Sequence, residues 1–310
     1  MTAPAPHSGR PRVGLMLPVS EGQMDGGTAR WADLLAMAQT AEAVGFDSLG
    51  LADHLIYRFP GQGESGPWEA FTILAALAAV TKRVQIAPLV ACTSFREPAL
   101  LAKMADTLDE ISGGRFILGL GAGWNQPEYS AFGYPYNHLA SRFEEALTII
   151  TGLLRGEHVT FQGRYYHVED AFLRPRGPSE RGPRILIGAA QPRMLRLVAQ
   201  HSDAWNTAWH TAPGMVSDAW SNMLAACNEV GRDPATLELT VGTAAHPREA
   251  GEGSSKQSDA VITGSPEEVA RALMAFGQLG ASHLIVNVQP RTVAGVERFG
   301  EVIRLMDQLA

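Results

Sequence analysis

Short apolar runs alternate with longer helical patterns along almost the whole chain of 310 residues. Runs of this kind are typical of buried strands, and apolar residues spaced three and four apart are typical of helices with one buried face. The pattern predicts eight strands, at residues 13–17, 48–51, 84–90, 116–120, 184–187, 204–207, 237–243 and 283–288. It predicts a helix after each strand, at residues 30–44, 69–80, 98–111, 142–154, 192–200, 215–230, 266–279 and 293–309. In the third helix, the spacing predicts a buried stripe of Leu100, Met104, Leu108 and Ile111.

Eight strand–helix units predict a (β/α)8 TIM barrel, a fold that takes about 250 residues and leaves room here for insertions. Two insertions are expected: a β-hairpin at residues 158–168, turned at Gln162–Gly163, and a polar loop at residues 246–259. A doubly wound sheet would also alternate strands with helices, but residues 17–29 lack its Gly-x-Gly-x-x-Gly fingerprint. We therefore predict one barrel domain at residues 13–310 after a flexible tail at residues 1–12.

Composition excludes two classes of partner. A net charge of −7 argues against nucleic-acid binding, which needs a basic surface. The longest apolar run, at residues 73–80, is far shorter than the roughly 20 residues of a membrane-spanning helix, so we expect no membrane partner.

The N-terminus has no apolar signal-peptide region, and the chain has only 2 cysteines. These features predict a cytoplasmic protein without a disulfide framework.

Active sites of (β/α)8 barrels lie where the strands end at their C-termini. The fifth strand ends in the small residues Gly188, Ala189 and Ala190, and Pro192 then opens a helix. Main-chain N–H groups at a helix N-terminus bind anions. Arg193 lies in the first turn, where its positive charge is repelled by the positive end of the helix dipole unless an anion lies between the two. A phosphate site and a solvated arginine on a tight turn account for this segment equally well.

Asp53 and His54, after the second strand, have three interpretations: a metal site, a polar pair for acid–base chemistry beside a cofactor ring, or a capping aspartate with a packed histidine. The other histidines show no ligand spacing, which disfavours a metal-dependent barrel hydrolase. Cys92 is interpreted as a pocket-lining residue, since nothing near it in sequence would activate a thiol nucleophile. The glycines of residues 119–123 are expected to let a flat ligand approach the backbone. Trp124, Trp205 and Trp209 are interpreted either as walls of that cavity or as ordinary packing at its rim.

Five stretches of the chain, between about residues 13 and 206, together resemble one enzyme family. They are GFDSLGLADH (45–54), FREPALLA (95–102), ISGGRFILGLGAGWNQPEYSAFG (111–133), SRFEEALTIITGLL (141–154) and PRILIGAAQPRMLRLVAQHSDAWN (183–206). The chain is similar in these stretches to the bacterial luciferase-like monooxygenase superfamily, and in particular to its branch of oxidoreductases that use the deazaflavin F420.

The resemblance implies a flavin or deazaflavin ring at the ends of the strands. It also implies a non-proline cis peptide at Leu89–Val90 against one face of that ring, and a phosphate held by Gly188, Ala189 and Ala190. The expected cofactor contacts are Asp53, His54, Leu89, Val90, Cys92, Gly121, Asn125, Gly188, Ala189, Ala190 and Arg193. The substrate pocket is expected at Trp124, Trp209 and His210. Sugar-phosphate dehydrogenases of the superfamily carry an acid where this chain has Trp124, which argues against that activity.

We therefore predict F420-dependent hydride transfer to or from a small, apolar organic substrate, with His54 nearest the transferred hydride and Asp53 as an orienting residue. The alternative is an FMN-dependent monooxygenase that uses O2 and takes reduced FMN from a reductase partner. A cofactor-binding protein without catalysis and a metal-dependent hydrolase are the other hypotheses. No bound metal is expected, and the family resemblance implies a homodimer.

Overall fold

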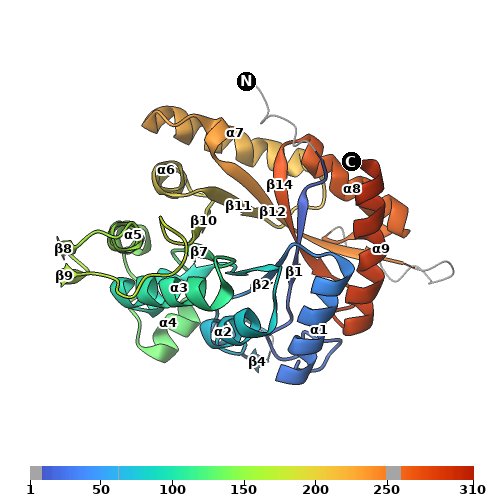
Figure 1. Cartoon of the computed structure of the whole chain (residues 1–310), viewed down its shortest axis with the longest axis horizontal. Helices are drawn as coiled ribbons and strands as arrows, with labels where there is room; N and C mark the ends of the chain where they lie inside the picture. The colour runs from blue at the N-terminus through green and yellow to red at the C-terminus, as the bar shows by residue number, and fades with distance from the viewer. Residues whose placement is uncertain (1–8, 62, 249–259) are drawn as a thin grey trace. The chain divides into compact units, whose positions relative to one another are not determined.

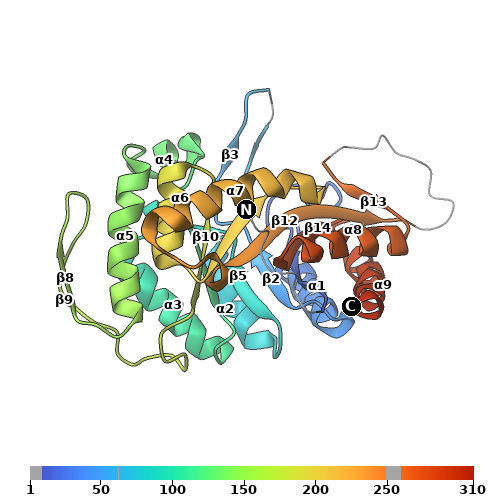
Figure 2. The same ribbon diagram turned by 90° about the horizontal axis from the view of Figure 1, so that it is seen from above.

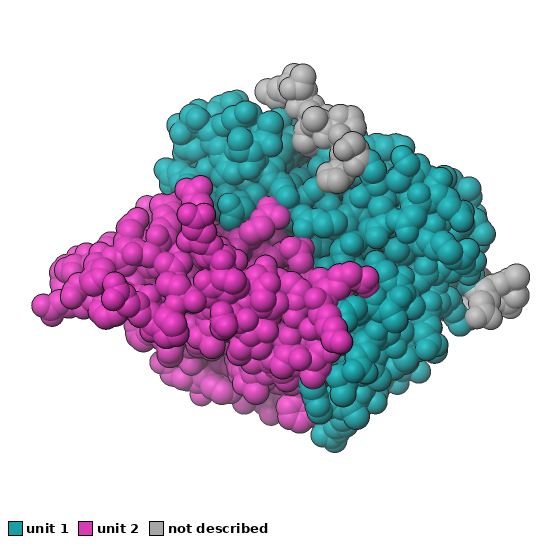
Figure 3. Space-filling model, viewed as in Figure 1, with its two compact units in different colours: residues 1–50, 189–310 teal, residues 51–188 magenta. Residues whose placement is uncertain are grey.

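The computed structural model describes residues 9–61, 63–248 and 260–310, which form two compact units (Figure 3). Unit 1 comprises Met1–Gly50 and Ala189–Ala310, and unit 2 comprises Leu51–Gly188. Residues 1–8 of the predicted tail lie outside the described residues. Arg10 already forms an ion pair with Asp47 at 2.7 Å, and Arg12 begins the first strand.

Unit 1 contains a parallel sheet whose strands lie in the order β2 (Ser48–Leu51), β1 (Arg12–Met16), β14 (Ala281–Val288), β12 (Glu238–Pro247) and β11 (Ala204–Ala208). The short strand β13 (Ile262–Gly264) pairs with the end of β12. The helices are α1 (Trp31–Val44), α6 (Pro192–His201), α7 (Pro213–Val230), α8 (Pro266–Gln278) and α9 (Val293–Leu309), with a 3-10 turn at Pro234–Thr236. Helix α9 packs against α1 and α8, as Figure 1 shows.

Unit 2 is built on β7 (Ile117–Gly121), which pairs in parallel with β10 (Arg184–Gly188) and with β6 (Ala91–Cys92). A bridge from Ile86 to Phe116 adds β5 (Gln85–Pro88). The helices are α2 (Ala70–Val80), α3 (Pro98–Ser112), α4 (Gln126–Phe132) and α5 (Leu139–Leu154), with a 3-10 turn at Thr93–Phe95. The two hairpins are β3 (Tyr57–Arg58) with β4 (Glu64–Ser65), and β8 (Val159–Gln162) with β9 (His167–Ala171).

The β8–β9 hairpin confirms the insertion predicted before the fifth barrel strand, and Figure 2 shows it beside α5. The predicted turn at Gln162–Gly163 and the predicted end at residue 168 are wrong, because the turn lies at residues 163–166 and β9 continues to Ala171. The predicted end of the seventh strand at Thr243 is wrong, because β12 continues to Pro247. It does so because β13 supplies a pairing partner for its last three residues. Residues 249–259 of the predicted polar loop lie outside the described residues.

Of the buried stripe predicted for α3, Leu108 is confirmed, but its two ends, Leu100 and Ile111, are wrong. Leu100 and Ile111 are 55% and 44% exposed, whereas Leu101, Ala102, Ala105 and Leu108 are buried. The buried face therefore lies about one residue, or about 100° around the helix, from the predicted one. Two aspartates explain the difference. Asp106 and Asp109 are buried on this face because they accept hydrogen bonds from the main chain of residues 177–179.

Arg115 joins the end of α2 to the start of β7. Its guanidinium donates to the carbonyl oxygens of Ala78, Thr81, Val84 and Ser112 at 2.7–3.0 Å. The last carbonyls of a helix have no partner within the helix, so Arg115 satisfies groups that would otherwise be buried unpaired. We expect Arg115→Met to lower the free energy of unfolding by about 2–4 kcal/mol, measured by urea denaturation.

Arg196→Met is the matched control, since Arg196 forms an exposed ion pair with Glu229 at 3.3 Å. Exposed pairs contribute about 0–1 kcal/mol. Equal losses of unfolding free energy in the two variants would show that the Arg115 contacts stabilise the protein no more than an exposed ion pair does.

Candidate active site

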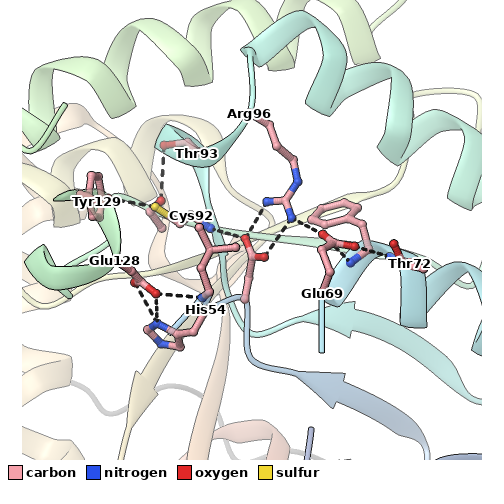
Figure 4. Close-up of polar contacts among 12 residues, drawn as sticks. His54, Glu69, Thr72, Cys92, Thr93, Arg96, Glu128 and Tyr129 are labelled. Atoms are coloured by element: carbon pink, nitrogen blue, oxygen red, sulfur yellow. Dashed lines mark hydrogen bonds and ion pairs between the residues drawn. The ribbon is translucent and has the colours of Figure 1, made fainter. Parts of the chain in front are cut away.

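Unit 2 gathers polar side chains from the segments that follow β2, β6 and β7 (Figure 4). His54 and Asp53 are adjacent in sequence but belong to separate hydrogen-bond networks. The first network joins His54 to Glu128, and the second joins Asp53 to Arg96 and Glu69. Sequence reasoning found Asp53 and His54 but missed their partners.

Glu128 is the partner of His54. The Nδ1 atom of His54 lies 3.0 Å from Oε1 and 3.3 Å from Oε2 of Glu128, and Oε2 also accepts a hydrogen bond from the main-chain N–H of Leu55 at 2.9 Å. The Glu128 side chain is 1% exposed, and the His54 side chain is 16% exposed. A buried carboxylate therefore holds one edge of an imidazole that still reaches solvent.

Asp53 is held by Arg96. Its carboxylate accepts two hydrogen bonds from the guanidinium of Arg96, at 2.7 and 3.0 Å, and one from the main-chain N–H of Cys92 at 2.9 Å. Two parallel hydrogen bonds between a guanidinium and a carboxylate are among the stronger and more directional interactions in proteins. Burial alone would lower the pKa of Arg96, but its hydrogen bonds to Asp53 and Glu69 raise the pKa above its ordinary value. Asp53 thus anchors the end of β6, in keeping with an orienting role.

Cys92 is a neutral thiol. Its Sγ lies 2.9 Å from the hydroxyl oxygen of Tyr129, and that hydroxyl donates to the carbonyl oxygen of Ala122 at 2.9 Å. Because a tyrosine has one hydroxyl proton, the Cys92 thiol is the donor toward Tyr129. Burial raises the pKa of Cys92 to about 12 and also raises the pKa of Tyr129. This chemistry agrees with the interpretation of Cys92 as a lining residue.

Native protein should therefore resist thiol alkylation. A thiol with a pKa of about 12 is ionised about a thousandfold less at pH 8 than free cysteine, and burial also raises the pKa of Cys227. We expect iodoacetamide at pH 8 to leave both cysteines unmodified in the native protein and to modify both after unfolding in urea, as measured by mass spectrometry. Rapid labelling of native Cys92 would contradict the neutral thiol.

The glycines near the end of β7 make room for protein side chains. A Cβ atom at Gly121 would lie 2.6 Å from Val90 Cγ2, and one at Gly188 would lie 3.3 Å from both Val90 methyls. Gly123 has a φ of +80°, and a Cβ there would overlap the Tyr129 hydroxyl. Val90 and Tyr129 thus occupy the space on the Cβ side of Gly121 and Gly123, which the sequence analysis assigned to a flat ligand. Gly121 as a direct cofactor contact stays a prediction.

The Leu89–Val90 peptide is cis, as the family resemblance implied. The residues that follow β7 are tied to the segment after β2, since the buried side chain of Asn125 donates to the carbonyl oxygen of Ile56 at 2.8 Å. Leu89, Val90 and Asn125 all belong to unit 2, as does His54.

Three aromatic side chains, Tyr57, Phe59 and Trp124, form what we call the aromatic wall. The His54 ring lies 4.8 Å from the Tyr57 ring and 5.4 Å from the Trp124 ring, between centroids. Phe59 stacks on Trp124 with their centroids 6.3 Å apart and an interplanar angle of 11°. Trp124 is 57% exposed, so the wall presents apolar surface to solvent beside His54.

The segment that follows β10 belongs to unit 1 from Ala189 onward. The carbonyl oxygen of Ala189 accepts a hydrogen bond of 2.8 Å from the indole N–H of Trp205. Trp205 is buried and packs against Trp220 of α7, with ring centroids 6.0 Å apart, so its expected place in a cavity wall is wrong. Because Trp205 holds the carbonyl of the trans Ala189–Ala190 peptide, the N–H of Ala190 points the opposite way.

Trp209 and His210 follow β11 in unit 1. The Ala208–Trp209 peptide is cis, which the sequence did not predict. The Trp209 ring lies over Gly242, where a Cβ would be 3.4 Å from it. His210 Nε2 lies 2.8 Å from Thr207 Oγ1, and burial lowers the pKa of His210, which favours the neutral imidazole.

The expected site residues thus fall into two sets. Unit 2 holds Asp53, His54, Leu89, Val90, Cys92, Gly121, Trp124, Asn125 and Gly188, and unit 1 holds Ala189, Ala190, Arg193, Trp209 and His210. Within the described residues, no group of three or more His, Cys, Asp or Glu side chains is placed to hold a metal ion. No helix of that part of the chain is long and apolar enough to cross a membrane.

The chain belongs to the luciferase-like monooxygenase family, because the model of that family matches residues 12–262. Among its relatives, pyrimidine monooxygenase RutA from Caulobacter sp. (strain K31) is 30% identical over 302 residues, which cover 88% of this chain and 81% of that protein. An F420-dependent glucose-6-phosphate dehydrogenase from Microbacterium testaceum (strain StLB037) is 37% identical over 179 residues, covering 56% of this chain and 52% of that one.

Solved structures agree with the family in fold. An F420-dependent secondary alcohol dehydrogenase, in complex with an F420–acetone adduct, superposes with a TM-score of 0.79 at 20% identity, covering 96% of this chain and 99% of that one. A riboflavin lyase with modified FMN superposes with a TM-score of 0.79 at 14% identity, covering 95% and 91%. These matches confirm the predicted (β/α)8 barrel class. The relatives include a pyrimidine monooxygenase and an F420-dependent dehydrogenase, which confirms the predicted oxidoreductase class.

Proposed function

We propose that the protein transfers hydride between F420 and a small, apolar organic substrate. The observation that carries this proposal is the arrangement around His54, a partly exposed imidazole held by a buried carboxylate beside an exposed aromatic surface. FMN-dependent monooxygenation with O2 is the second candidate, because the relatives include both F420-dependent enzymes and a pyrimidine monooxygenase.

The turn from Gly188 to Arg193 is proposed to hold the phosphate of the cofactor. The N–H of Ala190 points away from Trp205, because Trp205 holds the carbonyl oxygen of Ala189, and α6 then begins at Pro192 with its positive dipole end. Arg193 lies in the first turn of this helix and adds a cation. These groups suit a phosphate ester, which both F420 and FMN carry.

The bound ring would supply the hydride chemistry. Val90 and Cys92 are proposed to contact it from the end of β5 and from β6, and Asp53 to hold Cys92 and Arg96 in place. His54 is proposed to exchange a proton with the substrate oxygen while hydride is transferred at carbon. The aromatic wall would receive the apolar part of the substrate. Trp124 belongs to this wall and stands at the position where sugar-phosphate dehydrogenases of the family carry an acid, so an apolar side chain replaces a charged one there.

An anaerobic assay tests this function. Purified protein with reduced F420 is mixed with acetophenone or with cyclohexyl methyl ketone, a saturated counterpart of similar size, and alcohol formation is measured by gas chromatography. We expect reduction without oxygen, with acetophenone favoured about threefold to tenfold because its ring stacks on the aromatic wall. Turnover that needs both FMN and oxygen would favour the monooxygenase instead.

We also propose that the chain is a single-domain homodimer in the cytoplasm and takes its reduced cofactor from a separate flavin or F420 reductase. The two free, buried cysteines fit a reducing compartment. Analytical ultracentrifugation tests the oligomeric state, and a monomeric sedimentation coefficient at micromolar concentration would contradict the dimer.

A further inference from the structure

Glu128 was not among the residues expected at the site, and the proposed function gives it no role beyond holding the His54 ring. We propose that Glu128 is a positioning residue that fixes the tautomer of His54, so that Nε2 is the atom that exchanges the proton with substrate. This inference rests on the proposed function for the identity of the reaction. The tautomer itself can be measured without cofactor or substrate.

The contacts of Glu128 fix which atoms carry protons. Its carboxylate lies 3.0 Å from His54 Nδ1 and 2.9 Å from the main-chain nitrogen of Leu55. An ionised carboxylate only accepts hydrogen bonds, so Nδ1 must carry a proton. A neutral imidazole has one N–H, and Nε2 is then left with its lone pair. In this state His54 can take a proton at Nε2, and after protonation it can return one from the same atom.

The burial of Glu128 makes this contact hard to replace. A carboxylate that is 1% exposed needs compensating donors, and within the described residues these donors are the His54 ring and the Leu55 N–H. Loss of the contact to His54 would leave a buried charge with one donor. The free energy of the buried carboxylate therefore favours the Nδ1–H form of His54.

The surroundings hold the imidazole in place. The Tyr57 and Trp124 rings also pack against it, with centroids 4.8 and 5.4 Å from that of the imidazole. Glu128 stands in the first turn of α4, whose N-cap residue Asn125 donates to the carbonyl oxygen of Ile56 at 2.8 Å. The segments after β2 and β7 are thus joined at both Asn125 and Glu128, so the ring has little freedom to turn away.

Glu128→Gln should reverse the tautomer. The side-chain carbonyl of the glutamine is needed to accept from the Leu55 N–H, which places its NH2 group against His54 Nδ1. That NH2 group donates, so Nδ1 must become an acceptor and Nε2 must carry the proton. A residue that merely supports the loop would leave the tautomer of His54 unchanged.

Two-bond 1H–15N correlation spectra of protein labelled with 15N-histidine measure the tautomer directly, at a pH where His54 is neutral. The His54 signals are assigned by their loss in His54→Asn. We expect the Nδ1–H form to be the major one in the wild type and the Nε2–H form in Glu128→Gln. Asp170→Asn is the matched control, since Asp170 pairs with the exposed His158 at 2.7 Å and should leave the His54 signals unchanged.

A major Nε2–H form in the wild type would overturn the proposal even if the glutamine variant did not fold. An unchanged tautomer in a folded Glu128→Gln variant would overturn it as well. Failure of the proposed function gives a different pattern. In that case the tautomer reverses as expected, but the wild type loaded with F420 or with FMN shows no turnover.

Discussion

His54→Ala should lower the turnover number of F420-dependent hydride transfer by about a hundredfold to ten-thousandfold, the usual contribution of a positioned general acid–base. The reason is that the imidazole is the partly exposed titratable group beside the aromatic wall, and alanine can neither take nor give a proton. The dissociation constant of F420 should change by less than about threefold, because the phosphate turn is untouched. Steady-state kinetics and a fluorescence titration measure the two effects.

His158→Ala provides the control for this variant. His158 is exposed and pairs with Asp170 in the β8–β9 hairpin, so it has the same chemistry but no place at the site. We expect its turnover to match the wild type. A turnover of His54→Ala equal to that of His158→Ala would show that His54 does not take part in the reaction.

Ala189→Asp should weaken F420 binding by about thirtyfold to a thousandfold. The substitution places a carboxylate in the turn proposed to hold a phosphate, and two like charges about 4 Å apart near a protein surface repel by up to about 4 kcal/mol. The Trp205 hydrogen bond involves the carbonyl oxygen of residue 189 and should survive the change of side chain. Fluorescence quenching gives the dissociation constants of wild type and variant.

Ala189→Ser is the matched neutral substitution, and it should bind F420 within about threefold of the wild type. The dephosphorylated cofactor gives a second comparison, since the repulsion acts on the phosphate group. Equal dissociation constants of wild type and Ala189→Asp for F420 would show that the phosphate does not bind at this turn.

The alternation of strands and helices could be predicted because it depends on local periodicity. Helix α5 shows this well, since its apolar residues Phe143, Leu147, Ile150 and Leu154, spaced three and four apart, are all buried. Helix α4 escaped prediction because its 7 residues, with a proline in the first turn, are too few to show a period. The face of α3 was misjudged because buried aspartates, which look like solvent-facing residues in sequence, carry hydrogen bonds to residues 177–179.

The candidate site could be predicted only in part. Asp53, His54 and Cys92 stand at strand ends, where the fold class directs attention. Glu128 lies 74 residues from His54 in sequence, so only the folded chain brings the two together. The sequence did contain one signal for Glu128. It is the only acidic residue in NQPEYSAFG (125–133), the segment that follows the glycines at the end of the fourth predicted strand.

The glycines after β7 illustrate the same limit. Glycine indicates that something approaches the backbone, but it does not indicate what approaches. Here Val90 fills the space at Gly121, and Tyr129 fills the space at Gly123. The cis peptide at Leu89–Val90 was expected from the family resemblance alone, while the one at Ala208–Trp209 had no signal.

The central claim is that a redox cofactor binds here through its phosphate, at the turn that begins at Gly188. Fluorescence titrations of the purified protein with F420, FMN and the dephosphorylated form of each test it most directly. We predict saturable binding of F420, weaker binding of FMN, and a loss of at least tenfold in affinity when the phosphate is removed. Failure to bind either cofactor, or equal affinity for the phosphorylated and dephosphorylated forms, would contradict the claim.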